Sequence, residues 1–331
     1  TGNAAVSGGG VYVDNSEFQL LAGSVKGNTA TSGAVTRAHF ENNTIAAASI
    51  AGGGGVYVYG EDSLFWLAEG LISGNTTKGS GGGVLVNGSL IPDNPVNTPH
   101  NFLMSAGTIG DNVSSGSVWP HGGGGVYVAK GVFEMIDGHI TGNQSIRQGG
   151  GVFVWSRSLF YLDGNSSVTN NKGVGSSKAI CSRGITTMSG KAQADKVYIW
   201  NYAKGSWNNG AGDQFTMTED ARVTGLELAF ADDPKDYRNY VNLTSSSGSF
   251  NGTDLIATIG LESHLTSSGS FAKDATIDSD WLNRHLIKYA NGTSNISATV
   301  NRFSISNYIN GLATTNLTSY KLDSTGKLVK K

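Results

Sequence analysis

The stretch GGGGVYVYGEDSLFWLAEGLISGN, residues 52–75, sets four consecutive glycines beside a run rich in valine, tyrosine, phenylalanine and tryptophan. Glycine loses more backbone freedom on folding than any other residue, whereas the residues that follow it here favour β-strands. A structure that uses both needs backbone positions without side chains next to a packed strand. The rest of the chain shows how often that combination recurs.

Two elements of this stretch recur in the same order five times. The first is a glycine triplet that leads into a Val-x-Val strand. The second is a Phe-x-Leu/Met strand, with an asparagine ten residues after its phenylalanine. This constant interval identifies a sequence repeat. The five valines are Val11, Val56, Val84, Val126 and Val152, the phenylalanines are Phe18, Phe65, Phe102, Phe133 and Phe160, and the asparagines are Asn28, Asn75, Asn112, Asn143 and Asn170.

The repeat unit is about 26 residues long and carries three insertions. The first valines of successive copies are 45, 28, 42 and 26 residues apart, and Ala179 of a degenerate sixth copy follows 27 residues later. The extra residues fall between the two conserved elements, as expected for surface loops on a scaffold of stacked repeats. Insertions one, two and three are residues 29–52, 87–101 and 113–122.

The pattern within each unit predicts β-structure. Apolar residues alternate with period two and are β-branched or aromatic. Three short strands and three turns in about 26 residues make one coil of a parallel β-helix, with neighbouring coils about 4.8 Å apart. The valines and phenylalanines should then form two interior ladders, and the corner asparagines should hydrogen-bond along the axis.

The repeat fades after residue 191, which predicts a division of the chain. We expect a parallel β-helix over residues 1–230 and a β-rich C-terminal cap over residues 231–331. Within the cap, residues 278–292 favour a helix, and a hairpin is expected around residues 324–326. At the other end, Gly2 and Asn3 match a repeat corner, so we expect the chain to start in mid-solenoid as a fragment of a longer protein.

Aromatic residues on the outer side of the strands are the strongest candidates for ligand contact. If the valines face inward, Tyr12, Tyr57, Leu85, Tyr127 and Phe153 face outward, and such a stripe is a platform for sugar rings. The alternative is that the insertion loops or the next sheet cover the stripe. We expect a groove lined by Tyr57, Tyr59 and Trp66 between insertions one and three. The candidate ligand-binding residues are Tyr57, Tyr59, Trp66, Tyr127, Trp155 and Tyr161.

Titratable residues give a weaker indication of chemistry. The outward positions of the phenylalanine strands run Gln19, Trp66, Leu103, Glu134 and Tyr161, with one acidic residue. Asp137 and Asp163 fit solvated turns better than a catalytic pair. His39 with Glu41, Asp93 with His100, and His121 fall in the three insertions and would form a site only if those loops converge. No catalytic or metal-ligating set is therefore assigned.

Composition bounds the classes of function. The formal net charge is −2, which gives no electrostatic signature for nucleic acid or an anionic membrane. The sequence contains no run of 18 apolar residues, so no membrane span is expected. Cys181 is the one cysteine, which excludes an intramolecular disulfide, and it fits a small core residue on the valine ladder. No cofactor is implied.

The repeat resembles a known class of proteins. Its GGGVYV and F-x-[LM]-x-x-G-x-I-x-G-N elements are similar to the glycine-rich right-handed parallel β-helix repeats of bacterial cell-surface proteins, of the spirochaete type, and follow the same logic as polymorphic outer membrane protein repeats. The resemblance covers about residues 1–190. It implies a non-enzymatic extracellular or cell-surface stalk or adhesin with a glycan or host-surface ligand. The alternative is a carbohydrate-active enzyme, a polysaccharide lyase or glycosidase, with a site built from the three insertions.

Overall fold

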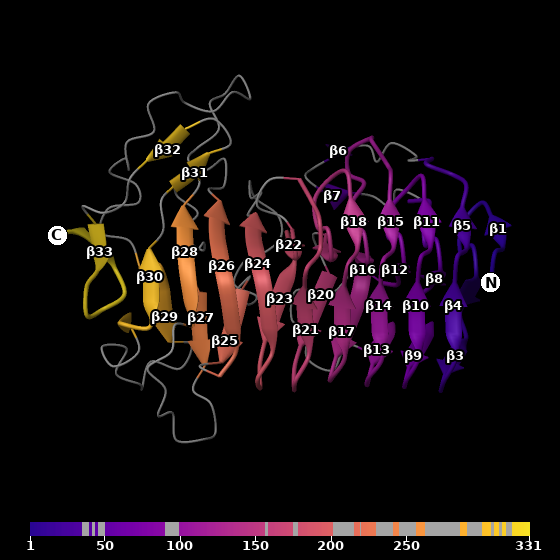
Figure 1. Ribbon diagram of the computed structural model, residues 1–331, viewed down its shortest axis with the longest axis horizontal. Coiled ribbons are helices and arrows are strands. Elements are labelled where there is room, and N and C mark those ends of the chain that lie inside the picture. The colour runs from indigo at the N-terminus through magenta and orange to yellow at the C-terminus, as the bar shows by residue number, and fades with distance from the viewer. Residues whose placement is uncertain are drawn as a thin grey trace.

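The computed structural model is an all-β parallel β-helix whose coils follow one another along a single axis (Figure 1). Strands of successive coils pair in parallel, so each side of the solenoid is a sheet that runs along the axis. The structure describes residues 1–34, 40–41, 44–45, 50–89, 99–155, 158–174, 178–200, 215–218, 220–229, 241–244, 256–261, 285–289, 300–305, 308–310, 313–315 and 320–331.

The strands that follow the glycine triplets form the triplet sheet. The five valines of the repeat pair in register along it, which confirms the predicted valine ladder. Its strands are β2 (Val11–Asp14), β8 (Val56–Tyr59), β12 (Val84–Asn87), the start of β16 (Val126–Met135), β19 (Val152–Val154), β22 (Ile180–Ser182), the ends of β24 (Gln193–Trp200) and β26 (Arg222–Ala229), β28 (Ala257–Leu261) and β30 (Phe303–Ile305).

The Phe-x-Leu/Met strands form the phenylalanine sheet, and their five phenylalanines also pair in register, as predicted. The centroids of consecutive rings are 5.1, 5.0, 4.7 and 5.5 Å apart; the first three pairs are stacked and the last is tilted. Its strands are β3 (Glu17–Leu20), β9 (Leu64–Leu67), β13 (Phe102–Met104), the end of β16, β20 (Ser158–Leu162), β23 (Ile185–Met188), β25 (Phe215–Thr218), β27 (Val241–Thr244) and β29 (Ile287–Tyr289).

Two further sheets complete the first five coils, where the sequence predicted one. The isoleucine sheet carries an inward ladder that includes Ile72, Ile109 and Ile140. Its strands are β4 (Ser24–Lys26), β10 (Leu71–Ser73), β14 (Thr108–Gly110), β17 (His139–Thr141), β21 (Ser167–Thr169) and the starts of β24 and β26. A short sheet follows it, of β1 (Ala4–Ala5), β5 (Thr29–Ala30), β11 (Thr76–Thr77), β15 (Val113–Ser114) and β18 (Gln144–Ser145).

The short sheet corrects the limits of two insertions. Thr29–Ala30 and Val113–Ser114 pair with the same positions of neighbouring coils and therefore belong to the regular coil. A two-residue strand carries too little periodicity to be recognised from sequence. Insertions one and three start after these strands, and insertion one holds a small antiparallel pair, β6 (Phe40–Glu41) and β7 (Thr44–Ile45).

Buried asparagines form a continuous hydrogen-bonded ladder at the corner before the short sheet. The backbone N and the Nδ2 of each asparagine donate to the Oδ1 of the asparagine in the next coil, at 2.9 to 3.2 Å. Nδ2 also donates backwards, as from Asn112 to the Ile72 carbonyl at 2.9 Å. Every side-chain polar atom inside the ladder is thus satisfied. The ladder is Asn3, Asn28, Asn75, Asn112, Asn143 and Asn171.

The last member corrects the predicted register, because Asn171 and not Asn170 continues the ladder. The turn between Leu162 and Val168 is one residue longer than its counterpart between Met135 and Ile140. The same extra residue places Ile180, rather than Ala179, opposite Val152. Asn170 instead occupies the left-handed corner before the ladder, with φ 57°, where Gly74 has φ 60°.

The three glycines of a triplet are required for three different reasons, as residues 53–55 show. Gly53 has φ +65°, which L side chains rarely adopt. A Cβ on Gly54 would lie 2.3 Å from the Gly82 carbonyl oxygen, and one on Gly55 would lie 2.9 Å from Asn75 Nδ2. The triplet therefore turns the chain, lets coils approach and leaves room for the asparagine ladder.

The C-terminal part differs from expectation in two respects. Parallel pairing continues past residue 230 through β27, β28, β29 and β30, so the coil does not stop at the predicted boundary. The helix predicted over 278–292 is wrong at residues 287–289, which form β29; its residues 278–284 and 290–292 lie outside the described residues. Backbone pairing with β27 outweighs local helix propensity there.

Antiparallel hairpins are found near the C-terminus. β33 (Tyr320–Leu322) and β34 (Leu328–Lys330) confirm the predicted hairpin around residues 324–326, and Leu328 is buried in the main core. A second antiparallel pair consists of β31 (Tyr308–Asn310) and β32 (Ala313–Thr315), which Figure 1 shows standing off the side of the solenoid.

Replacing Asn143 by alanine should destabilise the fold strongly. The change removes the acceptor for the backbone N and Nδ2 of Asn112, and buried unsatisfied groups cost about 1–3 kcal/mol each. We expect a loss of at least about 2 kcal/mol in the free energy of unfolding, measured by denaturant titration. Asn170→Gly is the matched control, since glycine tolerates the positive φ, and an equal loss in both variants would contradict the assigned register.

Phe133→Ala should cost about 3–5 kcal/mol, because it removes a fully buried ring from the centre of the stacked ladder. Ile136→Ala, three residues further on at an exposed position, is the control and should cost less than about 1 kcal/mol. Thermal unfolding of both variants measures the difference, and similar shifts in melting temperature would argue against an interior phenylalanine ladder.

Candidate functional site

The aromatic ladder of the triplet sheet faces outward, as the alternation predicts, but it is covered. Tyr57, Leu85, Tyr127 and Phe153 are buried and form a second apolar cluster on the outer side of the sheet. The expectation of an open stripe is therefore wrong for Tyr57, Tyr127 and Trp155. Cys181 is buried, but it pairs with Phe153 and so lies on this ladder instead of the valine ladder.

Insertions one and three supply the cover, which is the alternative that the sequence left open. Ile50 of insertion one is part of the buried cluster. Trp119 of insertion three packs edge-on against Trp155, with ring centroids 5.5 Å apart. Because the strands are regular and the insertions leave at one corner, both loops fold back over the same outer face.

His121 ties the two insertions together. Its Nε2 lies 3.3 Å from the Gly33 carbonyl oxygen, which can only accept, so Nε2 carries the proton. Its Nδ1 then accepts from the Ser80 hydroxyl at 3.1 Å. The imidazole is buried, and burial is the main cause that lowers its pKa. His121 is thus a neutral structural contact between loops.

The exposed end of the triplet sheet carries two tyrosines. Tyr12 and Tyr59 are 49% and 43% exposed, and both rings contact the buried ring of Tyr57 edge-on. The Tyr57 hydroxyl accepts from Asn87 Nδ2 at 2.8 Å, while burial raises the pKa of Tyr57 to about 12. Tyr59 is therefore available to a ligand, whereas Tyr57 is buried and packs against its ring.

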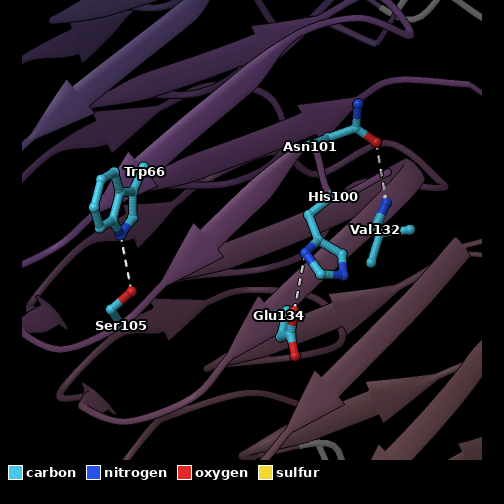
Figure 2. A network of polar contacts seen from close by, with 6 residues as sticks. All are labelled: Trp66, His100, Asn101, Ser105, Val132 and Glu134. Atoms are coloured by element: carbon cyan, nitrogen blue, oxygen red, sulfur yellow. Dashed lines mark hydrogen bonds and ion pairs between the residues drawn. The ribbon is translucent and has the colours of Figure 1, made fainter. Parts of the chain in front are cut away.

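Trp66 does not belong to this tyrosine cluster, so the predicted groove of Tyr57, Tyr59 and Trp66 is divided between two sheets. Trp66 lies on β9 of the phenylalanine sheet, where its Nε1 donates to the Ser105 hydroxyl at 2.8 Å (Figure 2). The turn at residues 60–63 separates β8 from β9, which directs their outward side chains to different faces.

The outer face of the phenylalanine sheet forms the second candidate surface, which we call the outer ladder. Its members pair in register as the sequence predicts, and all except the exposed Gln19 are half-buried. Glu134 pairs with His100 of insertion two, with Nδ1 and Oε2 3.0 Å apart (Figure 2). Burial and the Glu134 charge raise the pKa of Tyr161. The outer ladder is Gln19, Trp66, Leu103, Glu134 and Tyr161.

Asn101 fixes the position of insertion two beside this ladder. Its Oδ1 accepts from the Val132 backbone N at 3.1 Å (Figure 2). Its Nδ2 donates to the Ser63 carbonyl at 3.1 Å. Sequence reasoning identified neither Asn101 nor Ser105 as part of the surface. Asn101 and Ser105 lie directly before and after strand β13, two residues on either side of the outward-facing Leu103. Extending the period-two alternation by one residue beyond each strand end would therefore have identified both.

The remaining titratable candidates that the structure describes do not converge on a site. The carboxylates of Asp137 and Asp163 each accept from the backbone N of the following glycine at 2.6 Å, as turn aspartates do. His39 and Asp93 lie outside the described residues. Glu134 is the one carboxylate of the outer ladder, whereas glycoside hydrolysis commonly uses two.

Comparison with protein-family models, with curated proteins and with solved structures gives no match. The resemblance to bacterial surface repeats therefore stays a prediction from the sequence. In the part of the chain that the structure describes, no helix is long and apolar enough to cross a membrane.

The buried His121 predicts a pH dependence of stability. The unfolded chain binds the proton more readily, because the folded pKa lies below the usual value of 6.5. The contribution of neutral His121 is complete above about pH 6.5 and is lost as the pH falls through the folded pKa. The stability advantage of the wild type over His121→Gln should therefore shrink between about pH 8 and pH 5 in thermal unfolding. A constant difference would show that His121 does not titrate this way.

Proposed function

We propose that the chain is a non-enzymatic, surface-exposed or secreted β-helix that serves as a stalk or adhesin and binds carbohydrate along its outer ladder. The observation that carries the proposal is the pair of half-buried aromatic rings, Trp66 and Tyr161, on one face of a regular sheet with a carboxylate–histidine pair between them. Localisation at the cell surface rests on the resemblance of the repeat.

The spacing of the outer ladder suits an extended sugar chain. Trp66 and Tyr161 are three coils apart, which is about 14 Å at the usual distance between strands. Two aromatic rings at that separation can each cover the apolar face of one sugar ring. Between them, Glu134 offers a carboxylate oxygen that accepts from sugar hydroxyls, and His100 offers its Nε2, which accepts in the neutral imidazole and donates in the imidazolium.

The surface is held in place before any ligand arrives. The Trp66 indole is fixed by its bond to Ser105, and the Glu134 carboxylate by His100. Under the strand, the rings of Phe65, Phe102 and Phe133 are stacked, and Phe160 continues the ladder with a tilted ring. A site that is ordered in advance loses less side-chain entropy on binding, which favours affinity on an open surface.

Replacing Trp66 and Tyr161 together by alanine should weaken glycan binding at least about 10-fold, since the change removes two large apolar surfaces from the ligand and a loss of about 1.4 kcal/mol is already tenfold. A glycan array identifies the ligand, and titration calorimetry compares the variants. Tyr12→Ala with Tyr59→Ala is the matched control, because it removes two exposed rings from the triplet sheet. Loss in the control alone would move the site to the tyrosines, and cleavage of polyuronides by the wild type would favour the enzyme alternative.

A further inference from the structure

Exposed apolar side chains gather at the corner where insertion three leaves the solenoid. Val118 and Trp119 of the insertion are 56% and 37% exposed, and Ile146 and Val174 of the next two coils are 45% and 55% exposed. Ile146 and Val174 each lie three residues after a ladder asparagine, at Asn143 and Asn171, so they are neighbours along the axis. Apolar side chains grouped in this way mark a contact surface more often than scattered ones do.

Hydrogen bonds join these residues into one surface. The Arg147 guanidinium donates to the Ser117 carbonyl, with Nε 2.9 Å from the oxygen, and so holds insertion three against the next coil. The Val174 backbone N donates to the Arg147 carbonyl at 3.1 Å. Insertion three, Arg147 and Val174 therefore occupy three successive coils at the same corner.

The same corner is locally basic although the whole chain has a formal net charge of −2. Lys172 and Lys178 are exposed in the coil that carries Val174. Arg183 directly follows strand β22 of the triplet sheet in the same stretch of chain. From residue 139 to residue 183, the sequence has one acidic residue, Asp163, at the turn after the phenylalanine-sheet strand β20. In the next coil, Asp195 accepts from the Asn170 backbone N at 2.6 Å, two residues before Lys172, so Lys172, Lys178 and Arg147 outnumber this one carboxylate. A positive surface beside exposed apolar groups selects an anionic partner.

The position of Trp119 decides which anionic partner fits. Its ring rests against Trp155, and the Arg183 guanidinium carbon lies 5.4 Å from its centroid and 4.5 Å from that of Trp155. The indole is thus held against the body of the protein. Insertion into a bilayer interface requires a side chain that projects from the surface. A ligand that lies along the surface suits this geometry better.

We propose that this corner patch, defined by Val118, Trp119, Ile146, Arg147, Lys172 and Val174, binds an acidic polysaccharide. Trp119 and the aliphatic side chains would contact sugar C–H faces, while Lys172 and Arg147, with Lys178 and Arg183 beside them, would attract uronate carboxylates. Neighbouring coils are about 4.8 Å apart, which is comparable to the length of one sugar residue. Basic side chains of neighbouring coils, such as Arg147 and Lys172, are therefore spaced like the carboxylates of successive uronate residues. The patch and the outer ladder lie on different sheets, and the inference holds whether or not the outer ladder binds sugar.

The test uses the full chain and polygalacturonate, with the fully methyl-esterified polymer as the uncharged form of the same backbone. We expect binding to the acid form, and at least about 10-fold weaker binding for Lys172→Glu/Lys178→Glu and for Trp119→Ala, measured by calorimetry. Lys26→Glu/Lys191→Glu is the matched control, since it makes the same charge change at exposed positions on other faces, and it should bind like the wild type.

Three results would overturn the proposal. The first is equal binding of the acid and esterified polymers. The second is an equal loss of affinity for polygalacturonate in the Lys172/Lys178 and Lys26/Lys191 variants. The third is binding to phosphatidylglycerol vesicles that depends on Trp119, in the absence of any binding to polygalacturonate. The Trp66 and Tyr161 double variant separates the two surfaces, because it should retain polyuronate binding at the corner patch even if the outer ladder binds nothing.

Discussion

The asparagine ladder and the glycine triplet beside it set the geometry on which the structure depends. Each ladder amide satisfies its hydrogen bonds only if the next coil places another asparagine at the same corner. The third glycine of each triplet must lack a side chain, because a Cβ on Gly55 would lie 2.9 Å from Asn75 Nδ2. Two elements far apart within a coil are thereby coupled, and a buried polar network of this kind tolerates no slip of one residue. The valine, phenylalanine and isoleucine ladders then enclose one continuous core.

This constraint also explains where the chain varies. Extra residues at the corner between the short and triplet sheets leave both ladders intact, and the chain accommodates two loops there. The loops return over the outer side of the triplet sheet, where Ile50 and Trp119 cover aromatic residues and His121 connects the two loops. Among the residues that the structure describes, no loop covers Trp66 or Tyr161 of the phenylalanine sheet in this way, and both side chains stay half-buried. The scaffold and its insertions together decide which aromatic rings a ligand can reach.

The two proposed surfaces use the same scaffold in different ways. On the outer ladder, regular strands present side chains that are fixed by short polar contacts, such as the Trp66 indole on Ser105. At the corner patch, a loop is held by Arg147 and by the packing of Trp119, and local charge supplies selectivity for an anion. A solenoid can carry several such surfaces along its length, because each coil contacts only its neighbours and can vary independently.

The sequence by itself determined the coil, the two interior ladders, the outward alternation and the hydrogen-bonded asparagines, because each depends on a local period that repeats every coil. It could not decide that Asn171 replaces Asn170, since both are asparagines and only pairing with Asn143 distinguishes them. Nor could it decide that Tyr127 and Trp155 are buried while Trp66 and Tyr161 are partly open, because burial depends on where the insertions fold back. Strand periodicity is a property of neighbouring residues, whereas the cover over a strand comes from loops distant in sequence, and the tertiary structure alone brings these together.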